Sequence, residues 1–106
     1  MGFADAIRLP RPTHALAAHR AAIRDIALES GARDVLLFGS TGRGTDRGGS
    51  DLDLLLIDPP TALSGFTLVR LERRIANLAG VPVQLLTIRD LPEAMRARVL
   101  AEARAL

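Results

Sequence analysis

Hydrophobic residues follow helical spacing in three stretches of the chain. The first covers residues 13–30, with Thr13 as the expected N-cap and Gly31 where the helix would end. The second covers residues 64–79, and the third begins at Asp90 and continues to the C-terminus. Apolar residues recur three or four positions apart in these stretches, which places them on one face of a helix. The pattern therefore predicts three amphipathic helices.

Three other stretches are almost continuously apolar, which is typical of buried strands. They cover residues 34–38, 51–57 and 81–88. The first two are separated by residues 39–50, where five of twelve positions are glycine and we expect no regular element. This order of elements predicts an α+β fold, a small mixed sheet of at least three strands with helices packed on it.

Chain length and composition favour one small globular domain. With 106 residues the chain can bury one modest core, and 48% hydrophobic with 25% charged residues is ordinary for a folded protein. We interpret residues 1–12 as an N-terminal arm and residues 13–106 as a single domain. The chain has no cysteine, no signal-like start and no apolar run long enough to cross a membrane, so we expect a cytoplasmic protein.

The charged and aromatic residues give no support to direct nucleic-acid binding. All 14 basic residues are arginine, and the 12 acidic residues reduce the net charge to +2. The aromatic residues are three phenylalanines, too few to build the stacking surfaces that readers of single strands use. Direct nucleic-acid binding is therefore unsupported.

Packing does not explain the composition of the glycine-rich segment, residues 39–50. Dense glycines let backbone N–H groups approach an anion, phosphate above all. A P-loop is excluded because the chain has no lysine, and a dinucleotide fingerprint starting at Gly42 would need its third glycine where Arg47 stands. An EF-hand loop starting at Asp46 would need glycine where Asp51 stands. The segment also fits one calcium-binding β-roll repeat, but a single copy cannot build that fold.

Two polar groups flank this segment and together predict a site for a metal and a phosphate. Residues two apart in a strand share a face, so the carboxylates of Asp51 and Asp53 are expected to point the same way. Two adjacent carboxylates repel each other unless a cation lies between them, and Mg²⁺ or Mn²⁺ takes such oxygen ligands. The Gly39-Ser40 turn can hold phosphate oxygens with backbone N–H groups and a hydroxyl. This combination is typical of metal-assisted chemistry on nucleoside triphosphates.

The same residues carry a resemblance to a known family. The run from Phe38 to Gly44, followed by Ser50-Asp51-Leu52-Asp53, resembles the nucleotidyltransferase superfamily that includes DNA polymerase β, and more specifically its minimal nucleotidyltransferases, called MNT or MntA. The resemblance implies that Asp51 and Asp53 are catalytic and hold the metal. It assigns nucleotide binding to Gly39, Ser40, Arg43, Gly44 and Ser50.

The resemblance also implies a partner and a reaction. Proteins of this kind are generally encoded beside a HEPN-domain partner, and the pair acts as a toxin–antitoxin system. The resemblance implies that the nucleotidyltransferase transfers AMP from ATP onto a tyrosine of the toxin. We therefore expect an antitoxin that forms a hetero-oligomer with a HEPN toxin, with Mg²⁺ or Mn²⁺ as cofactor and ATP as substrate.

One position departs from the family pattern. Gln84 stands where active relatives carry a third carboxylate. Gln cannot accept a proton from an attacking hydroxyl, and a general base contributes about 10²–10⁴ in rate. Two hypotheses therefore stay open. The protein is either an adenylyl-transferring antitoxin with weakened catalysis, or a catalytically degenerate fold that acts as a non-enzymatic binding antitoxin or assembly subunit.

Overall fold

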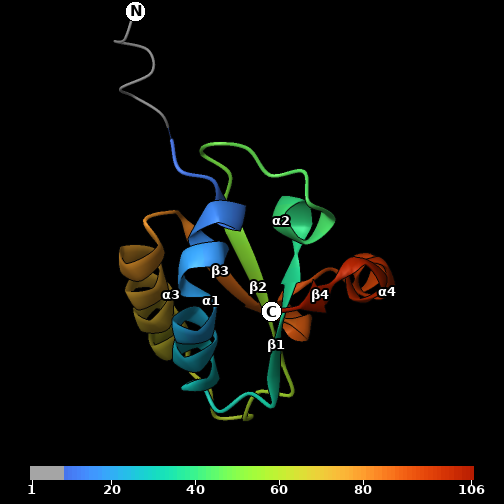
Figure 1. The fold of residues 1–106 in the computed structure, drawn as a ribbon. Coiled ribbons are helices and arrows are strands. Elements are labelled where there is room, and N and C mark those ends of the chain that lie inside the picture. Colours follow the sequence, from blue (N-terminus) through green and yellow to red (C-terminus); the bar gives the residue numbers. More distant parts are fainter. Residues whose placement is uncertain (1–8) are drawn as a thin grey trace, which may run out of the picture.

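A four-stranded mixed sheet forms the centre of the protein, as Figure 1 shows for the computed structural model, which describes residues 9–106. The strands are β1 (Asp34–Phe38), β2 (Leu52–Ile57), β3 (Val83–Thr87) and β4 (Arg104–Ala105). Their order in the sheet is β3-β2-β1-β4. β1 is antiparallel to both β2 and β4, whereas β2 and β3 are parallel. The predicted α+β class with a mixed sheet is confirmed.

Helices connect the strands within residues 9–106. They are α1 (Pro12–Leu28), α2 (Gly39–Arg43), α3 (Gly65–Ala79), the 3₁₀ helix η2 (Ile88–Asp90) and α4 (Glu93–Glu102). α3 carries the chain from β2 to its parallel neighbour β3, a connection that needs a crossover segment. In this described part of the chain, no helix is both long and apolar enough to cross a membrane.

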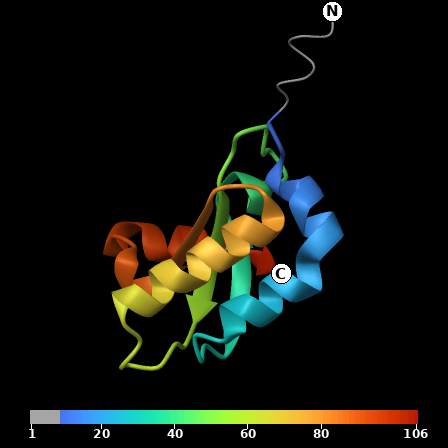
Figure 2. The same cartoon turned by 90° about the vertical axis from the view of Figure 1, so that its left-hand side faces the viewer.

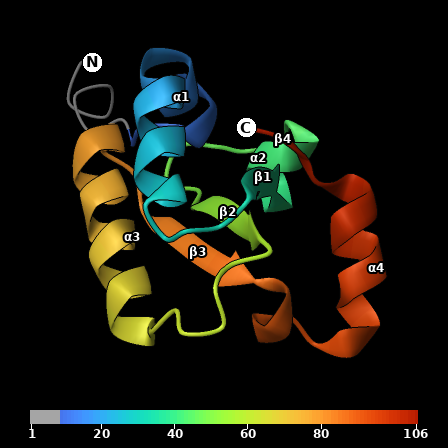
Figure 3. The ribbon, with the colours of Figure 1, turned by 90° about the horizontal axis from the view of Figure 1, so that it is seen from below.

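The helices cover both faces of the sheet. α1 and α3 pack together on one face (Figure 2), and α4 lies on the opposite side of the sheet (Figure 3). Leu54 and Leu56 of β2 belong to the core beneath α1 and α3, whereas Leu55 packs with Leu91 and Val99 beneath α4. This burial on two sides explains why β2 is apolar at every position except Asp53.

The second predicted helix is confirmed as α3, and its ends follow local rules. The Ser64 side chain accepts a hydrogen bond from the Thr67 N–H at 3.1 Å and so caps the first turn. Gly80 ends the helix with a left-handed φ of 73°. Leu71 and Ile75 are fully buried on the face toward the sheet.

The start of α1 differs from the prediction. The N-cap position is Arg11, two residues before the predicted Thr13, so the helix begins at Pro12. Thr13 does not cap it, because the Thr13 side chain binds Asp46 instead. The predicted N-terminal arm falls mostly on residues 1–8, which lie outside the described residues. Pro12, which we had assigned to that arm, is a buried residue of α1.

Two further predictions of local structure were wrong. Residues 39–43 form the short helix α2 rather than an irregular loop, and glycine permits this because a Cβ at Gly42 would lie only 3.0 Å from the Leu37 carbonyl oxygen. The last helix ends at Glu102 rather than at the C-terminus. Arg104 and Ala105 pair with the free edge of β1 and widen the sheet by one strand.

Candidate active site

The candidate site lies where β1 runs into α2, beside the start of β2. Phe38 at the end of β1 is the pairing partner of Asp53, so Gly39, the next residue, lies against the Asp53 side chain. A Cβ at Gly39 would collide with Oδ2 of Asp53, and Gly39 has a left-handed φ of 66°. Both conditions require glycine at this position. The structure thus brings the predicted Gly39-Ser40 turn directly beside one predicted carboxylate.

The Asp53 carboxylate lies close enough to Asp51 for their negative charges to repel each other. Burial and, to a smaller extent, the neighbouring Asp51 carboxylate raise the pKa of Asp53 from the ordinary 3.8 to about 6, although Arg43 partly opposes the rise. Asp51 precedes β2 and is exposed to solvent. Two carboxylates that repel each other at the end of a strand offer what a divalent cation needs.

The donor set available to a metal is small. Within residues 9–106, no three His, Cys, Asp or Glu side chains gather into a group that could hold an ion. The residues that fit a metal here are therefore Asp51 and Asp53 alone, and the remaining ligands of an ion would be water or phosphate oxygens.

Gln84 lies in this site. It pairs with Asp53 in the parallel register of β2 and β3, so the two side chains project from the same face of the sheet. Gln84 is exposed. The position where the family resemblance expects a third carboxylate is therefore beside the first two, but it carries a neutral amide.

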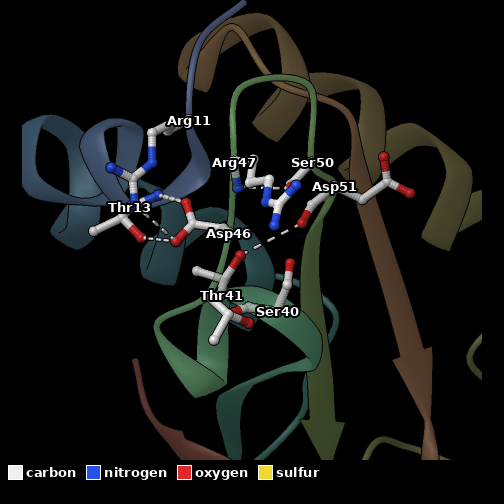
Figure 4. Close-up of polar contacts among 9 residues, drawn as sticks. Arg11, Thr13, Ser40, Thr41, Asp46, Arg47, Ser50 and Asp51 are labelled. Atoms are coloured by element: carbon white, nitrogen blue, oxygen red, sulfur yellow. Dashed lines mark hydrogen bonds and ion pairs between the residues drawn. The ribbon is translucent and has the colours of Figure 1, made fainter.

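The other predicted nucleotide-binding residues take part in the local structure of the loop. Gly44 ends α2 with φ 74°, and its N–H binds the Thr41 carbonyl. The Ser50 hydroxyl accepts a hydrogen bond from the Arg47 N–H at 2.9 Å. Figure 4 shows Ser40 and Thr41 on α2 facing the loop.

Two side chains near the site are held only loosely. Arg43 is half-exposed, with a guanidinium nitrogen 3.8 Å from a carboxylate oxygen of Glu102. In Figure 4 the exposed Asp51 carboxylate is turned away from the Ser40 hydroxyl. Since the Arg43 side chain is half-exposed and the Asp51 side chain is exposed, each can turn toward a ligand while its backbone stays in place.

A cavity of about 400 Å³ opens next to Gly39, between α2 and α4. Its walls are Phe38, Gly39, Arg43, Leu91, Met95, Arg98, Val99 and Glu102. Arg98 and Glu102 were not predicted as site residues. α4 is remote in sequence from the Gly39-Ser40 motif, and only the folded chain brings it there. A larger cavity, about 570 Å³, lies at the other end of β2, near Asp58, and does not reach the two carboxylates.

Comparison with known proteins identifies the family. A nucleotidyltransferase domain model matches residues 20–106. No curated protein sequence matches the chain significantly. A solved structure described as a minimal nucleotidyltransferase superposes with a TM-score of 0.77 at 35% identity, covering 89% of this chain and 95% of that one.

Two solved toxin–antitoxin structures share the fold at lower identity. One, described as a toxin–antitoxin with AMP-PNP, has a TM-score of 0.63 at 18% identity and covers 89% of this chain and 71% of that one. The other is a mutant MntA–HpeT toxin–antitoxin with two Asp-to-Glu substitutions two positions apart. It has a TM-score of 0.59 at 16% identity, and the match covers 74% of this chain and 64% of that one. With the matching domain model and the minimal nucleotidyltransferase at 35% identity, these findings show that the chain belongs to the nucleotidyltransferase domain family, among its minimal members.

Proposed function

We propose that this nucleotidyltransferase is an antitoxin that binds Mg²⁺–ATP and transfers AMP to a toxin partner of the HEPN type. The observation that carries the proposal is the repelling pair Asp51 and Asp53 next to the Gly39-Ser40 turn, with the pKa of Asp53 raised to about 6. A carboxylate whose charge is disfavoured in the free protein gains most when a cation arrives.

Different residues of the site would bind the metal, the phosphate oxygens and the rest of the triphosphate in such a transfer. Asp51 and Asp53 would hold Mg²⁺ or Mn²⁺, which neutralises phosphate charge when it is bound. Backbone N–H groups at Gly39 and Ser40, with the Ser40 hydroxyl, are suited to the phosphate oxygens. Arg43 can leave Glu102 to contact the triphosphate, because the two are 3.8 Å apart and half-exposed.

The proposed transfer forms one P–O bond and breaks another. A hydroxyl oxygen of the acceptor forms a bond to the α-phosphorus of ATP, and the bond between the α-phosphorus and the bridging oxygen breaks. Pyrophosphate leaves with that oxygen, and the hydroxyl proton passes to solvent or to a base. The product is an AMP ester of the acceptor.

The acceptor belongs to another molecule. The chain contains no tyrosine, so it cannot supply the phenol that the family resemblance implies. The two structural neighbours described as toxin–antitoxin pairs support a toxin as the partner. A stable complex of the two chains is therefore part of the proposal.

A second function has its own supporting observation. Gln84 pairs with Asp53 in the sheet, and a neutral amide there cannot accept the proton of an attacking hydroxyl. With transfer lost, Mg²⁺–ATP binding through Asp51 and Asp53 would remain, and the protein would neutralise its partner by binding.

One assay separates the two functions. The protein is purified with the product of the adjacent gene and incubated with Mg²⁺ and ATP labelled on the α-phosphate. Label on the partner supports transfer, and Asp53→Asn should abolish it while Asp58→Asn, at the far end of β2, should leave it unchanged. A stable complex that takes no label, even with Gln84→Asp, would contradict transfer and favour the binding antitoxin.

A further inference from the structure

Asp46 is a buried carboxylate within the glycine-rich segment that the proposed chemistry does not use. Its side chain has no exposure to solvent. Oδ2 accepts a hydrogen bond from the Thr13 N–H at 2.8 Å, and Oδ1 accepts one from the Thr13 hydroxyl. A guanidinium nitrogen of Arg11 lies 3.6 Å from Oδ1. Figure 4 shows Arg11 and Thr13 converging on Asp46 from the start of α1.

Asp46 lies 33 positions after Thr13 in the sequence, and its carboxylate takes the role of an N-cap for α1. The residue at the N-cap position, Arg11, makes no side-chain cap, and Pro12 has no N–H. The Thr13 N–H is therefore the first donor without a partner inside the helix, and a carboxylate is favourable at this end. Burial opposes the charge, but the Thr13 hydrogen bonds and Arg11 hold the pKa of Asp46 below its ordinary value. The contact is thus between a charged carboxylate and the helix.

A second contact ties the same loop to the residues before α1. The Gly49 N–H donates to the Pro10 carbonyl at 3.1 Å. A Cβ at Gly48 would lie 2.7 Å from the Leu9 carbonyl oxygen, so only glycine permits this close approach. The loop and the chain segment before α1 are therefore in close backbone contact.

The loop leads from these contacts directly to Asp51. Arg47 and Ser50 close a tight turn, since the Arg47 N–H donates to the Ser50 hydroxyl and the Ser50 N–H donates to the Arg47 carbonyl at 3.0 Å. The Asp51 carbonyl then accepts a weak hydrogen bond from the Thr41 hydroxyl at 3.4 Å. Asp51 makes no strand pairing of its own. The N–H of Leu52, the next residue, donates to the Pro82 carbonyl at 2.8 Å and anchors the C-terminal side of Asp51, so the loop sets the position of its N-terminal side.

We propose that Asp46 is a positioning residue for the metal site: it ties the loop before Asp51 to the start of α1 and so holds Asp51 where it can share a cation with Asp53. Without the Asp46 contacts, the loop can leave the conformation that places Asp51 beside Asp53. The apparent affinity for a metal–nucleotide then decreases in proportion to the fraction of molecules that keep this loop conformation, while the chemistry of the bound state is unchanged.

The test compares three variants for binding of Mg²⁺–AMP-PNP by titration calorimetry. Asp46→Ala removes every contact, and we expect its Kd to rise about tenfold. Asp46→Asn can keep both Thr13 hydrogen bonds, because an amide accepts at oxygen and donates at nitrogen, so its Kd should stay within about threefold of wild type. Thr13→Val removes only the hydroxyl and should fall between them. Asp58→Asn is the matched control and should bind like wild type.

Kinetics and hydrogen exchange distinguish positioning from general damage. The proposal rests on the proposed function for its kinetic arm, where Asp46→Ala should raise the KM for Mg²⁺–ATP and leave kcat at saturation within about twofold. A partly unfolded population would instead lower kcat at unchanged KM. Hydrogen exchange needs no activity: amides of residues 47–51 should exchange faster in Asp46→Ala, and those of α3 should not.

Each arm can overturn the proposal. Equal Kd and equal loop exchange in wild type and Asp46→Ala would show that the tie does not position Asp51. Faster exchange throughout α3 and the loop would show that Asp46 only stabilises the whole fold. If wild type binds no nucleotide, the proposed function fails, and the exchange of residues 47–51 still decides whether Asp46 orders the loop.

Discussion

Replacing Asp53 with asparagine should make the free protein more stable while destroying its metal site. Asn has the size of Asp, so it fits against Gly39 as Asp does, but it carries no charge. The ionised Asp53 is disfavoured in the folded state by burial and by Asp51, which together raise its pKa to about 6 from the ordinary 3.8. Removing the charge removes that penalty.

The magnitude and the pH range follow from this pKa. The rise corresponds to at most about 3 kcal/mol, and because Asp53 keeps partial contact with water, screening lowers the expected gain to about 1–2 kcal/mol. Below about pH 3 both folded and unfolded states are protonated and Asp53 carries no penalty. Between about pH 3 and 6 the unfolded state loses its proton first, so wild-type stability falls as the pH rises. Above pH 6 the penalty is complete.

Urea unfolding of wild type and Asp53→Asn at pH 3, 5, 6 and 7.5 measures this difference. The free energies of unfolding should be equal at pH 3, and the variant should exceed wild type by about 1–2 kcal/mol at pH 7.5. Added Mg²⁺ should stabilise wild type alone, since only wild type keeps both carboxylates. A variant that is less stable than wild type at pH 7.5, or a difference independent of pH, would refute the electrostatic reasoning.

The remaining predictions concern the turn, the third strand and the partner. Gly80→Ala, at a left-handed glycine with no atom within 4 Å of an added Cβ, should cost about 1–2 kcal/mol of stability, and Gly39→Ala should cost more. Thermal unfolding compares the two variants, and Gly39→Ala alone should also lose Mg²⁺ binding. Gln84→Asp should raise label transfer to the partner by about 10²-fold, the lower range for a general base, and an unchanged rate would place the base elsewhere. Co-expression with the adjacent gene product should give one peak in size-exclusion chromatography, whereas two separate peaks at micromolar concentration would contradict the proposed complex.

The sequence was sufficient for the parts of the fold that local rules govern. The apolar run of β2 indicated burial on both faces, and Leu54 and Leu55 do face two different cores. Ser64 and Gly80 marked the ends of α3 because a hydroxyl cap and a left-handed glycine act within one turn. Asp53 could be placed beside Gly39 in outline, since a strand, a turn and a second strand must pair closely.

The parts that the sequence did not reveal depend on contacts between distant segments. Thr13 has the side chain of an N-cap, but Asp46, which follows it by 33 residues, supplies the carboxylate that α1 uses. The final helix pattern concealed β4, because pairing with the edge of β1 at Arg104 outweighs helix propensity there. Arg98 and Glu102 carry no motif, and they enter the site only because α4 folds across the end of β1.

The pairing of Gln84 with Asp53 connects the activity of the site to the stability of the free protein. An aspartate at position 84 would be a third carboxylate on the same face as Asp53, whose pKa is already raised by burial and by Asp51. The added charge should raise the pKa of Asp53 further and lower the stability of the metal-free protein at pH 7.5, while Asp53→Asn in the same background should restore it. Urea unfolding of Gln84→Asp with and without Mg²⁺ tests this: the metal should stabilise Gln84→Asp more than wild type, because more repulsion is relieved. Equal stabilisation by Mg²⁺ in both proteins would mean that the charge at position 84 does not affect metal binding. The amide of Gln84 would then not account for a slow transfer reaction.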